Sequence, residues 1–408
     1  MPEPSYDVAA LRARFPALDA GYAHFDGPGG SQVPVEVARA VADTLTSPIA
    51  NRGTTYPAAR NAELVVLAAR QAMADLLAAD PAGIVFGRSM TALTMDLART
   101  LARDWGPGDE VVVTRLDHDA NVRPWVTAAG RVGATVRWLD LDPATCELDD
   151  VATVLSDRTR VVAVTGASNL VGTRPDLPAI AARVHATGAL FVVDGVHLTA
   201  HASIDVAALG ADVFLCSPYK FLGPHCGVLA AAPALLETLH PDKLLPSTDA
   251  VPERFELGTL PYELLAGTTA AVDVLASLGG GEGTRRHRLV VGMAAVEAHE
   301  DRLRRRIEQG LAMLPGVEVL SRARHRTPTL LARVPGGDRQ ASAFLAEHGV
   351  FAPSGSFYAL EPARRLGLGE AGGLRIGLAP YSDDDDVDRL LNSLGEACRV
   401  QGERNDGA

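Results

Sequence analysis

The sequence has few cysteines and no long hydrophobic run, and each absence excludes a class of protein. Its four cysteines, Cys146, Cys216, Cys226 and Cys398, are widely spaced and form no CxxC pair. A disulfide framework or a structural zinc site is therefore not expected. No apolar run is long enough to span a membrane, and the first residues lack the features of a signal peptide. We predict a cytoplasmic protein.

An excess of positive charge is also lacking. The formal net charge of −12 argues against a nucleic-acid or anionic-membrane partner, because phosphate contacts need clustered Lys and Arg. A small anionic ligand is still allowed, since a local group of donors can bind phosphate on an acidic protein. The content of 47% hydrophobic and 22% charged residues is typical of a globular protein. The length of 408 residues predicts one large and one small domain.

Short β-branched runs alternate with helical patterns between about residues 80 and 232. The runs that resemble strands are 84–86, 110–114, 134–139, 160–165, 189–194, 213–216 and 227–231. Helices are predicted over 90–104, 120–131, 148–156 and 177–187. Continuous apolar strands separated by helices predict an α/β fold with a mostly parallel sheet. Ligands of such sheets bind at loops beyond the carboxyl ends of the strands.

The pattern changes after Gly279-Gly280-Gly281. It predicts helices over 284–313 and near 339–348, strands over 317–320, 329–334 and 374–379, and a last helix that the hydroxyl of Ser382 could cap. Asp383 to Asp386 fall in the first turn of that helix, where carboxylates complement the helix dipole. A metal site is a weaker interpretation of this acidic run.

We therefore predict four regions. They are an N-terminal segment (1–30) near the small domain and active site, a large domain (31–280), a small C-terminal α+β domain (281–400) and a disordered tail (401–408).

Two polar residues directly follow buried strands. Asp194 ends the run ALFVVD, where a carboxylate needs a cationic partner or a strong donor. A protonated pyridine nitrogen would serve, and a helix-capping role is the alternative. Lys220 follows VFLC and precedes a turn rich in Gly and Pro. Such a position near a sheet edge suits a lysine that forms a Schiff base.

These segments resemble the class V aminotransferases of pyridoxal 5′-phosphate (PLP) fold type I, in particular cysteine desulfurases. The resemblance depends on Asp-x-x-His at 194–197, followed by Ser-x-x-Lys-x-x-Gly-Pro at 217–224, and extends over nearly the whole chain. It implies a large domain with a seven-stranded sheet and a smaller C-terminal domain. It also implies that Lys220 binds PLP covalently while Asp194 faces the ring nitrogen.

The resemblance implies further cofactor contacts. His118, in RLDHDANVRPW, would stack on the ring, and Thr91 with Met90, in FGRSMTALTM, would bind the phosphate at a helix start. Asn169 and His197 would lie near the phenolic oxygen. Ser217 and Tyr219 are also expected at the cofactor. Thr259, in RFELGTLPYE, would reach the phosphate of a neighbouring subunit, which implies a homodimer.

The same resemblance implies the substrate contacts. Arg375, in GLRIGLAPYS, would bind the substrate carboxylate through a bidentate contact. Gly30 and Ser31, in FDGPGGSQVP, together with Asn51 and Arg52, are expected near the substrate. No metal is expected. His197 and His201 have a spacing typical of helical metal ligands, but the only credible third ligand is Asp194, which the cofactor already uses.

One segment departs from the desulfurases, whose mobile loop contains a cysteine that attacks the substrate sulfur. Here the corresponding stretch, 352–359, reads APSGSFYA, with Tyr358 in place of the thiol. A phenol cannot form a persulfide, so standard desulfurase chemistry is not expected. Tyr358 is either a proton donor or a wall of the pocket. Cys216 and Cys226 flank Lys220 without a visible activating environment.

The expected reaction begins when Lys220 removes the α-proton of an amino-acid-like substrate, with PLP as electron sink. β-Elimination of a carbon–sulfur bond is our leading hypothesis. Epimerisation, transamination and decarboxylating or oxidative deamination are alternatives, and a PLP-binding scaffold is the non-enzyme alternative. The joint presence of Lys220, Asp194, His118 and Arg375 disfavours a scaffold. An NAD or FAD enzyme is not expected because no GxGxxG opens a βαβ unit.

Overall fold

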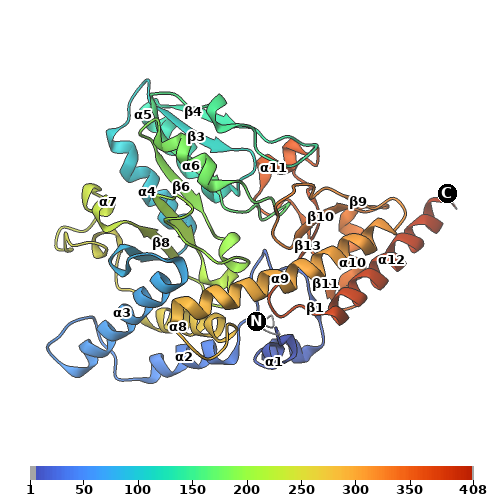
Figure 1. Ribbon diagram of the computed structural model, residues 1–408, viewed down its shortest axis with the longest axis horizontal. Helices are drawn as coiled ribbons and strands as arrows, with labels where there is room; N and C mark the ends of the chain where they lie inside the picture. Colours follow the sequence, from blue (N-terminus) through green and yellow to red (C-terminus); the bar gives the residue numbers. More distant parts are fainter. Residues whose placement is uncertain (1–5, 407–408) are drawn as a thin grey trace.

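The computed structural model describes residues 6–406 and has the predicted α/β fold (Figure 1). Its largest sheet has seven strands in the order β2–β8–β7–β6–β5–β3–β4. They are β2 (Ile84–Gly87), β3 (Glu110–Thr114), β4 (Thr135–Leu139), β5 (Thr159–Thr165), β6 (Leu190–Asp194), β7 (Val213–Cys216) and β8 (Gly227–Ala231). All neighbours from β7 to β4 are parallel, whereas β8 is antiparallel to both β2 and β7. The predicted strands and the mostly parallel sheet are confirmed.

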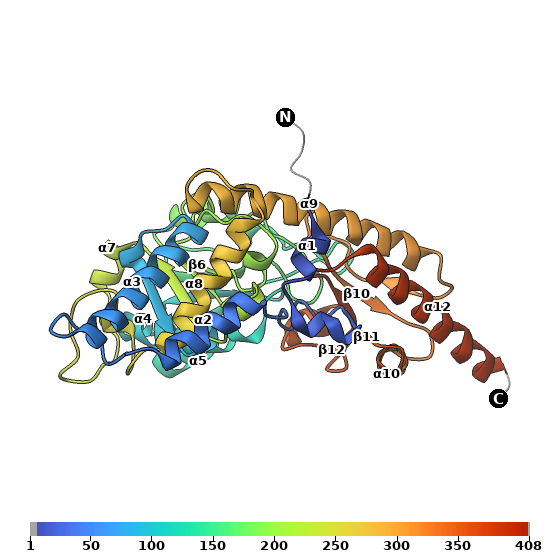
Figure 2. The same cartoon turned by 90° about the horizontal axis from the view of Figure 1, so that it is seen from below.

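The sheet is buried because apolar residues alternate between its two faces. In β6, Phe191 and Val193 contribute to one apolar cluster and Val192 contributes to the other. Side chains of α3 and α8 complete the first cluster, and those of α4 and α5 complete the second. Figure 2 shows α2, α3 and α8 together on one side of the sheet. Because helices cover both faces of the sheet, a ligand-binding site is expected at the loops beyond the strand ends.

Most of the predicted helices are present. The helices are α1 (Val8–Arg12), α2 (Val35–Thr46), α3 (Pro57–Leu77), α4 (Met90–Leu101), α5 (Arg123–Val132), α6 (Leu177–His185), α7 (Pro233–Thr238), α8 (Tyr262–Ser277), α9 (Arg285–Ala312), α10 (Asp338–Glu347), α11 (Leu360–Arg365) and α12 (Asp384–Asp406). The helix predicted over 148–156 is wrong, because only a 3₁₀ turn forms there, at Val151–Thr153. Leu148 instead pairs with Leu141 in an isolated β-bridge. The segment therefore enters this turn in an extended conformation.

A second, smaller sheet lies in the C-terminal part. Its order is β12–β13–β10–β9, and the paired strands are antiparallel. The strands are β9 (Glu318–Val319), β10 (Thr329–Arg333), β12 (Ser354–Gly355) and β13 (Gly373–Gly377). Near the N-terminus, β1 (Ala23–His24) pairs in parallel with β11 (Val350–Phe351). Part of the N-terminal segment thus packs within the C-terminal region.

Helix α9 joins the two regions, as Figure 2 shows. Its first half contributes Leu289 and Met293 to the core of the large sheet, whereas Leu303 and Ile307 pack under the small sheet. A domain boundary at residue 281 therefore precedes a helix that is shared between the two cores. The domain limits stay predictions, and residues 1–5 of the predicted segment 1–30 lie outside the described residues.

The cap of α12 differs from the prediction. Asp383, not Ser382, caps the helix, because its carboxylate accepts a hydrogen bond from the Asp386 N–H at 2.9 Å. The Ser382 hydroxyl instead accepts from the N–H of Ala379 at 3.0 Å. Since α12 continues to Asp406, it extends into the range 401–408 for which we predict a disordered tail, and residues 407–408 are not described.

Candidate active site

A cavity lies at the carboxyl edge of the large sheet. It is lined by residues that follow the ends of β3, β5, β6 and β7 and by the start of α4. These include Pro28, Met90, Thr91, His118, Asn169, Asp194, His197, Ser217, Tyr219 and Lys220. Lys220 and Asp194, which lie 26 positions apart in the sequence, thus line the same cavity.

Lys220 follows β7 in a short 3₁₀ turn and is partly buried. Its ammonium nitrogen donates to the carbonyl oxygen of Pro28 and lies 4.8 Å from the centroid of the Tyr219 ring. Burial, with a further contribution from the charge of Arg375, lowers the pKa of Lys220 to about 8. A substantial neutral fraction near physiological pH is what imine formation and proton abstraction both require.

The sequence contains only one other lysine, Lys243. Its Nζ atom is 3.2 Å from a carboxylate oxygen of Asp249 and donates to the Ser247 carbonyl oxygen, and Lys243 does not line the cavity. The choice between two lysines is a sequence signal that would have strengthened the prediction of Lys220.

Asp194 ends β6 and is almost fully buried. One carboxylate oxygen accepts the N–H of Val196 at 2.9 Å. Burial raises the pKa of Asp194 to about 6, although the Val196 N–H and the charge of Lys220 oppose the rise. A cation in the cavity would stabilise this carboxylate, and a protonated pyridine ring provides one.

His118 and the start of α4 provide two further features that fit PLP. The Nδ1 atom of His118 accepts the Ala120 N–H at 3.0 Å, and burial lowers the pKa of this ring to about 4. The ring is therefore neutral and suited to stacking. Met90 and Thr91 occupy the first turn of α4, where Ser89 caps the N–H of Ala92. Helix starts of this kind bind phosphate through free N–H groups and the helix dipole.

His197 and Asn169 line the cavity and keep unused hydrogen-bonding capacity. The Nε2 atom of His197 is 3.0 Å from the Oγ1 atoms of both Thr327 and Thr329, while its buried Nδ1 atom has no partner in the described structure. Asn169 donates from Nδ2 to the Phe357 carbonyl oxygen at 3.0 Å, and its buried Oδ1 atom also lacks a partner there. Both residues can therefore still bind polar groups of a ligand.

Arg375 lies on β13 next to the cavity but does not line it. Its guanidinium donates to the Asp26 carboxylate and to the Asn169 carbonyl oxygen, the latter at 3.2 Å. Its Nε atom is buried without a partner in the described structure.

The segment 352–359 covers this area. Phe357 and Tyr358 have positive φ angles of 53° and 58°, which non-glycine residues adopt at a cost. The Asp119 N–H donates to the Tyr358 carbonyl oxygen at 2.7 Å. The Tyr358 side chain is 77% exposed, with its ring centroid 5.6 Å from that of His118.

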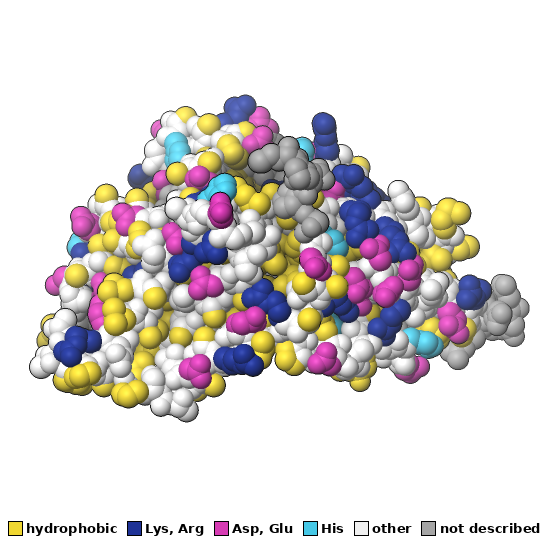
Figure 3. All heavy atoms as spheres, turned by 60° about the horizontal axis from the view of Figure 1, so that its bottom comes forward, with side chains coloured by type: hydrophobic (Ala, Val, Ile, Leu, Met, Phe, Trp, Pro, Cys, Tyr) yellow, Lys and Arg dark blue, Asp and Glu magenta, His cyan; other side chains and the backbone are white. Residues whose placement is uncertain are grey.

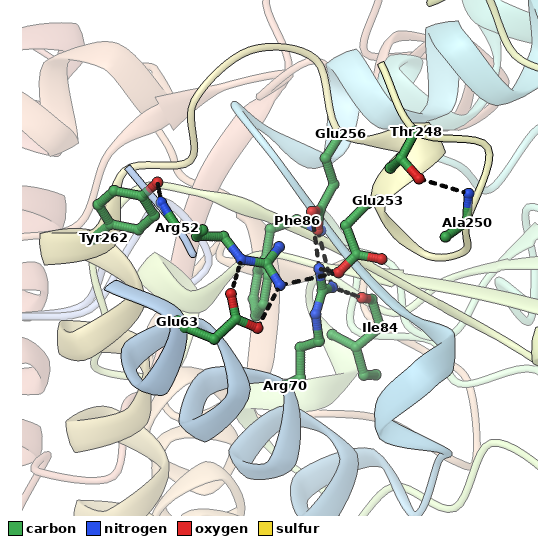
Figure 4. Close-up of polar contacts among 10 residues, drawn as sticks. All are labelled: Arg52, Glu63, Arg70, Ile84, Phe86, Thr248, Ala250, Glu253, Glu256 and Tyr262. Carbon is green, nitrogen blue, oxygen red and sulfur yellow. Dashed lines mark hydrogen bonds and ion pairs between the residues drawn. The ribbon is translucent and has the colours of Figure 1, made fainter. Parts of the chain in front are cut away.

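Asn51 and Arg52 do not line the cavity within this chain, and their place near the substrate stays a prediction. Figure 4 shows the contacts of Arg52. The Arg52 guanidinium donates to Glu63 at 2.9 and 3.0 Å and to Glu253 at 3.1 Å. Thr259 also lies outside the cavity lining and is exposed.

Gly30 and Ser31 lie against the turn that contains Lys220. The Ser31 hydroxyl accepts the Leu222 N–H at 2.8 Å and donates to the Tyr219 carbonyl oxygen at 3.2 Å, so it supports this turn. Gly30 has a φ of +154°, and a Cβ atom there would lie 3.3 Å from the Tyr219 ring.

Sequence reasoning missed four residues around the cavity. Asp26 pairs with Arg375, Pro28 accepts from Lys220, and Thr327 and Thr329 contact His197. Only Asp26 had a visible signal, because it is an acidic residue within an apolar N-terminal segment that was already assigned to the site.

The family comparison agrees with this geometry. The model of the family described as aminotransferase class-V matches residues 23–390. The chain belongs to the class V aminotransferase family. Members of this family and cysteine desulfurases depend on PLP, and PLP is the cofactor of this class V protein.

Two relatives and one solved structure illustrate the similarity. An uncharacterized protein of Mycobacterium tuberculosis is 35% identical over 398 residues, which cover 96% of this chain and 99% of the relative. A probable cysteine desulfurase of Pseudomonas putida is 31% identical over 420 residues, covering 97% and 99%. A cysteine desulfurase structure from Escherichia coli matches with a TM-score of 0.84 and 28% identity over 97% of this chain and 99% of the other. The predicted fold type I is confirmed.

In the part of the chain that the structure describes, the His, Cys, Asp and Glu side chains form no group of three or more that could bind a metal ion. No described helix has both the length and the apolar character to cross a membrane.

Proposed function

We propose that this class V protein is a lyase. It eliminates a β-substituent from an amino acid or cysteine conjugate, most simply by cleavage of a carbon–sulfur bond. The observation that supports this most is the shared cavity of Lys220 and Asp194, next to a loop segment in which Tyr358 replaces the desulfurase thiol. Removal of the α-proton then leads to elimination without a protein-bound persulfide.

Four residues at or beside the cavity have roles in this proposal. Bound PLP supplies an electron sink for the α-carbanion of the substrate. Lys220 accepts the α-proton, and its pKa of about 8 suits a general base near neutral pH. Asp194 keeps the cofactor nitrogen protonated, and His118 packs on the cofactor ring. Arg375 binds the substrate carboxylate and so orients the bond to be broken.

The cysteines do not offer a substitute nucleophile. Burial raises the pKa of Cys226 to about 11 and also raises that of Cys216. Cys146 is buried, and Cys398 lies on α12. A thiol must be deprotonated and accessible to attack sulfur. Burial disfavours both for Cys146, Cys216 and Cys226.

A product panel tests the proposal. The holoenzyme is incubated with amino acids and cysteine thioethers, and pyruvate, sulfide, free thiol and pyridoxamine phosphate are quantified. Pyruvate with thiol or sulfide supports elimination. Alanine with persulfide would show desulfurase activity and contradict our interpretation of Tyr358. Inversion at the α-carbon, pyridoxamine phosphate or carbon dioxide would instead indicate epimerisation, transamination or decarboxylation, and the absence of turnover and of any spectral response to PLP would favour a scaffold.

We also propose a cytoplasmic homodimer in which Thr259 reaches the cofactor phosphate of the partner subunit. Several large apolar side chains are exposed around α2, α3 and the 244–257 segment: Leu45, Tyr56, Leu64, Leu67, Leu244, Leu245 and Leu257. On the left of Figure 3, yellow side chains lie among mostly uncharged ones. Exposed apolar side chains that gather on one face support a protein interface there.

Mixed dimers test this arrangement. Lys220→Ala and Thr259→Ala subunits are each expected to be impaired alone. If Thr259 acts in the partner's site, a mixed dimer contains one site with both defects and one intact site, so mixing restores activity toward half of the wild-type value per dimer. The absence of any gain on mixing, with dimer exchange verified, would contradict the shared site.

A further inference from the structure

His197 is buried between the cofactor cavity and the small sheet. It is 3% exposed and lines the cavity, while its Nε2 atom is 3.0 Å from two hydroxyl oxygens, those of Thr327 and Thr329. Burial and the nearby positive charges of Lys220 and Arg375 lower the pKa of the ring well below its usual value. The imidazole is therefore neutral, with one nitrogen that donates and one that accepts.

Counting the hydroxyl hydrogens decides which nitrogen donates. The Thr327 hydroxyl donates to the Gly172 carbonyl oxygen at 3.3 Å. The Thr329 hydroxyl is buried, and its only hydrogen-bond partner in the described structure is His197 Nε2. If Nε2 had a hydrogen, the Thr329 hydroxyl hydrogen would have no acceptor there, and a buried unpaired donor costs about 1–3 kcal/mol.

With a ligand oxygen in the cavity, the opposite tautomer leaves none of these donors unpaired. The Thr329 hydroxyl then donates to a lone pair on Nε2, and the ring hydrogen is on Nδ1. Nδ1 is the buried atom of His197 that has no protein partner in the described structure. Its N–H group is free to donate to a ligand in the cavity.

We propose that Thr329 is a positioning residue that fixes His197 as an Nδ1–H donor toward an acceptor oxygen of the bound cofactor. The tautomer and its acceptor both depend on the cofactor site assigned above, because the Nδ1–H group has no protein partner in the described structure. Thr329 lies on β10 opposite Gly377 of β13, two residues from Arg375. The same pair of strands therefore positions this donor and the arginine expected to bind the substrate.

The buried pair of His201 and Glu300 packs against the His197 ring. His201 Nδ1 is 2.8 Å from a carboxylate oxygen of Glu300, and the ring centroids of His197 and His201 are 4.7 Å apart with an interplanar angle of 71°. The edge contact restricts rotation of His197, so that exchange of its two nitrogens requires both threonines and His201 to move.

Nitrogen NMR measures the tautomer directly. Solid-state ¹⁵N spectra of sedimented, [¹⁵N]histidine-labelled holoenzyme are compared with those of a His197→Gln variant, which identifies the His197 signals. We expect a protonated Nδ1 and an unprotonated Nε2. A protonated Nε2, or a doubly protonated ring, would overturn the inference. The same spectrum of the PLP-free protein tests the cofactor contact, because removal of the acceptor oxygen should shift the Nδ1 signal.

Isosteric variants test the effect on the cofactor. Thr329→Val removes the hydroxyl and keeps the shape, and we expect it to weaken PLP binding about fivefold and to shift the visible absorption of the bound cofactor. Thr329→Ser should restore both values. The control is Thr199→Val, since the Thr199 hydroxyl is equally buried but donates to the Gly195 carbonyl oxygen.

Unchanged absorption and PLP affinity in Thr329→Val, with the wild-type tautomer retained, would refute the positioning role. If Thr329→Val does not fold, the wild-type tautomer and the comparison of His197→Gln with His197→Leu still decide. Glutamine supplies an N–H donor and should retain PLP, and leucine should not.

Discussion

Arg375 and Asp26 form an ion pair beside the cavity, in which the Arg375 guanidinium also lies over the Phe357 ring with its central carbon 3.6 Å from the ring centroid. Arg375 is 2% exposed, whereas the Asp26 side chain is 47% exposed. A substrate carboxylate that approaches Arg375 must therefore share the guanidinium with Asp26 or displace it.

Arg375→Lys should reduce kcat/KM about 30- to 150-fold, because lysine keeps the charge but loses the planar fork. Kinetics with an amino-acid substrate and with its carboxamide analogue check this, since the analogue offers no carboxylate. An equal loss for both compounds would show that Arg375 serves the fold rather than the carboxylate.

The pKa of Lys220 predicts how cofactor loading depends on pH. Only the neutral amine attacks the aldehyde of PLP, and a pKa of about 8, below the ordinary 10.5, makes half of the amine neutral at pH 8. After removal of PLP, the rate at which the visible band returns should rise about tenfold per pH unit from pH 6 and level off above about 8. A plateau reached only above pH 10 would contradict a lowered pKa.

Lys220→Ala should abolish the visible band and lower turnover by at least about 10²–10⁴-fold, the usual contribution of a general base. Lys243→Ala provides the matched control, because its ammonium contacts only a surface loop. Absorption spectra and initial rates of the two variants are compared. Full activity in Lys220→Ala would refute the assignment of the lysine.

Tyr358→Phe distinguishes a pocket wall from a proton donor. The hydroxyl-bearing side chain is 77% exposed, and the loop is anchored through backbone atoms of Phe357 and Tyr358. For a lyase we therefore expect kcat within about threefold of wild type, since general acid catalysis would contribute at least about 10². A loss of that size, together with α-proton exchange from solvent, would favour an epimerase.

Glu256 pairs with Arg70 in the most buried part of the charged cluster in Figure 4. It contacts Arg70 at 2.9 and 3.0 Å and accepts the Phe86 N–H at 2.9 Å. Glu256→Ala should lower the free energy of unfolding by about 1–3 kcal/mol. The substitution leaves the Phe86 N–H unpaired and removes two contacts of the buried Arg70 guanidinium, which keeps its contacts with Glu253 and the Ile84 carbonyl oxygen. Arg302→Ala, which breaks an exposed pair with Asp384, should cost less than about 1 kcal/mol. Urea denaturation of both variants measures the difference, and similar losses would contradict this reasoning.

Local sequence patterns were sufficient to predict the strands and to predict which strand ends carry the site residues. Apolar runs that end in Asp194 or precede Lys220 identify buried strands, and parallel strands bring their carboxyl ends to one edge. The helix over 148–156 failed because its apolar spacing competes with the bridge between Leu141 and Leu148, a tertiary contact that no local pattern contains.

The contacts of long side chains could not be predicted. The family resemblance implies a place near the substrate for Arg52, and within this chain its guanidinium makes three contacts with the carboxylates of Glu63 and Glu253. Thr329 lies 132 positions from His197, and an isolated threonine in a strand pattern gives no sign of its partner. Pairing of this kind depends on how the two sheets are packed together.

Only two of the 38 basic residues are lysines, which limits the reaction of the protein with aldehydes. Guanidinium groups do not condense readily with pyridoxal compounds, so an excess of cofactor finds few competing amines on the surface. Amine-directed tethering would likewise attach most molecules through Lys243 and so in one orientation.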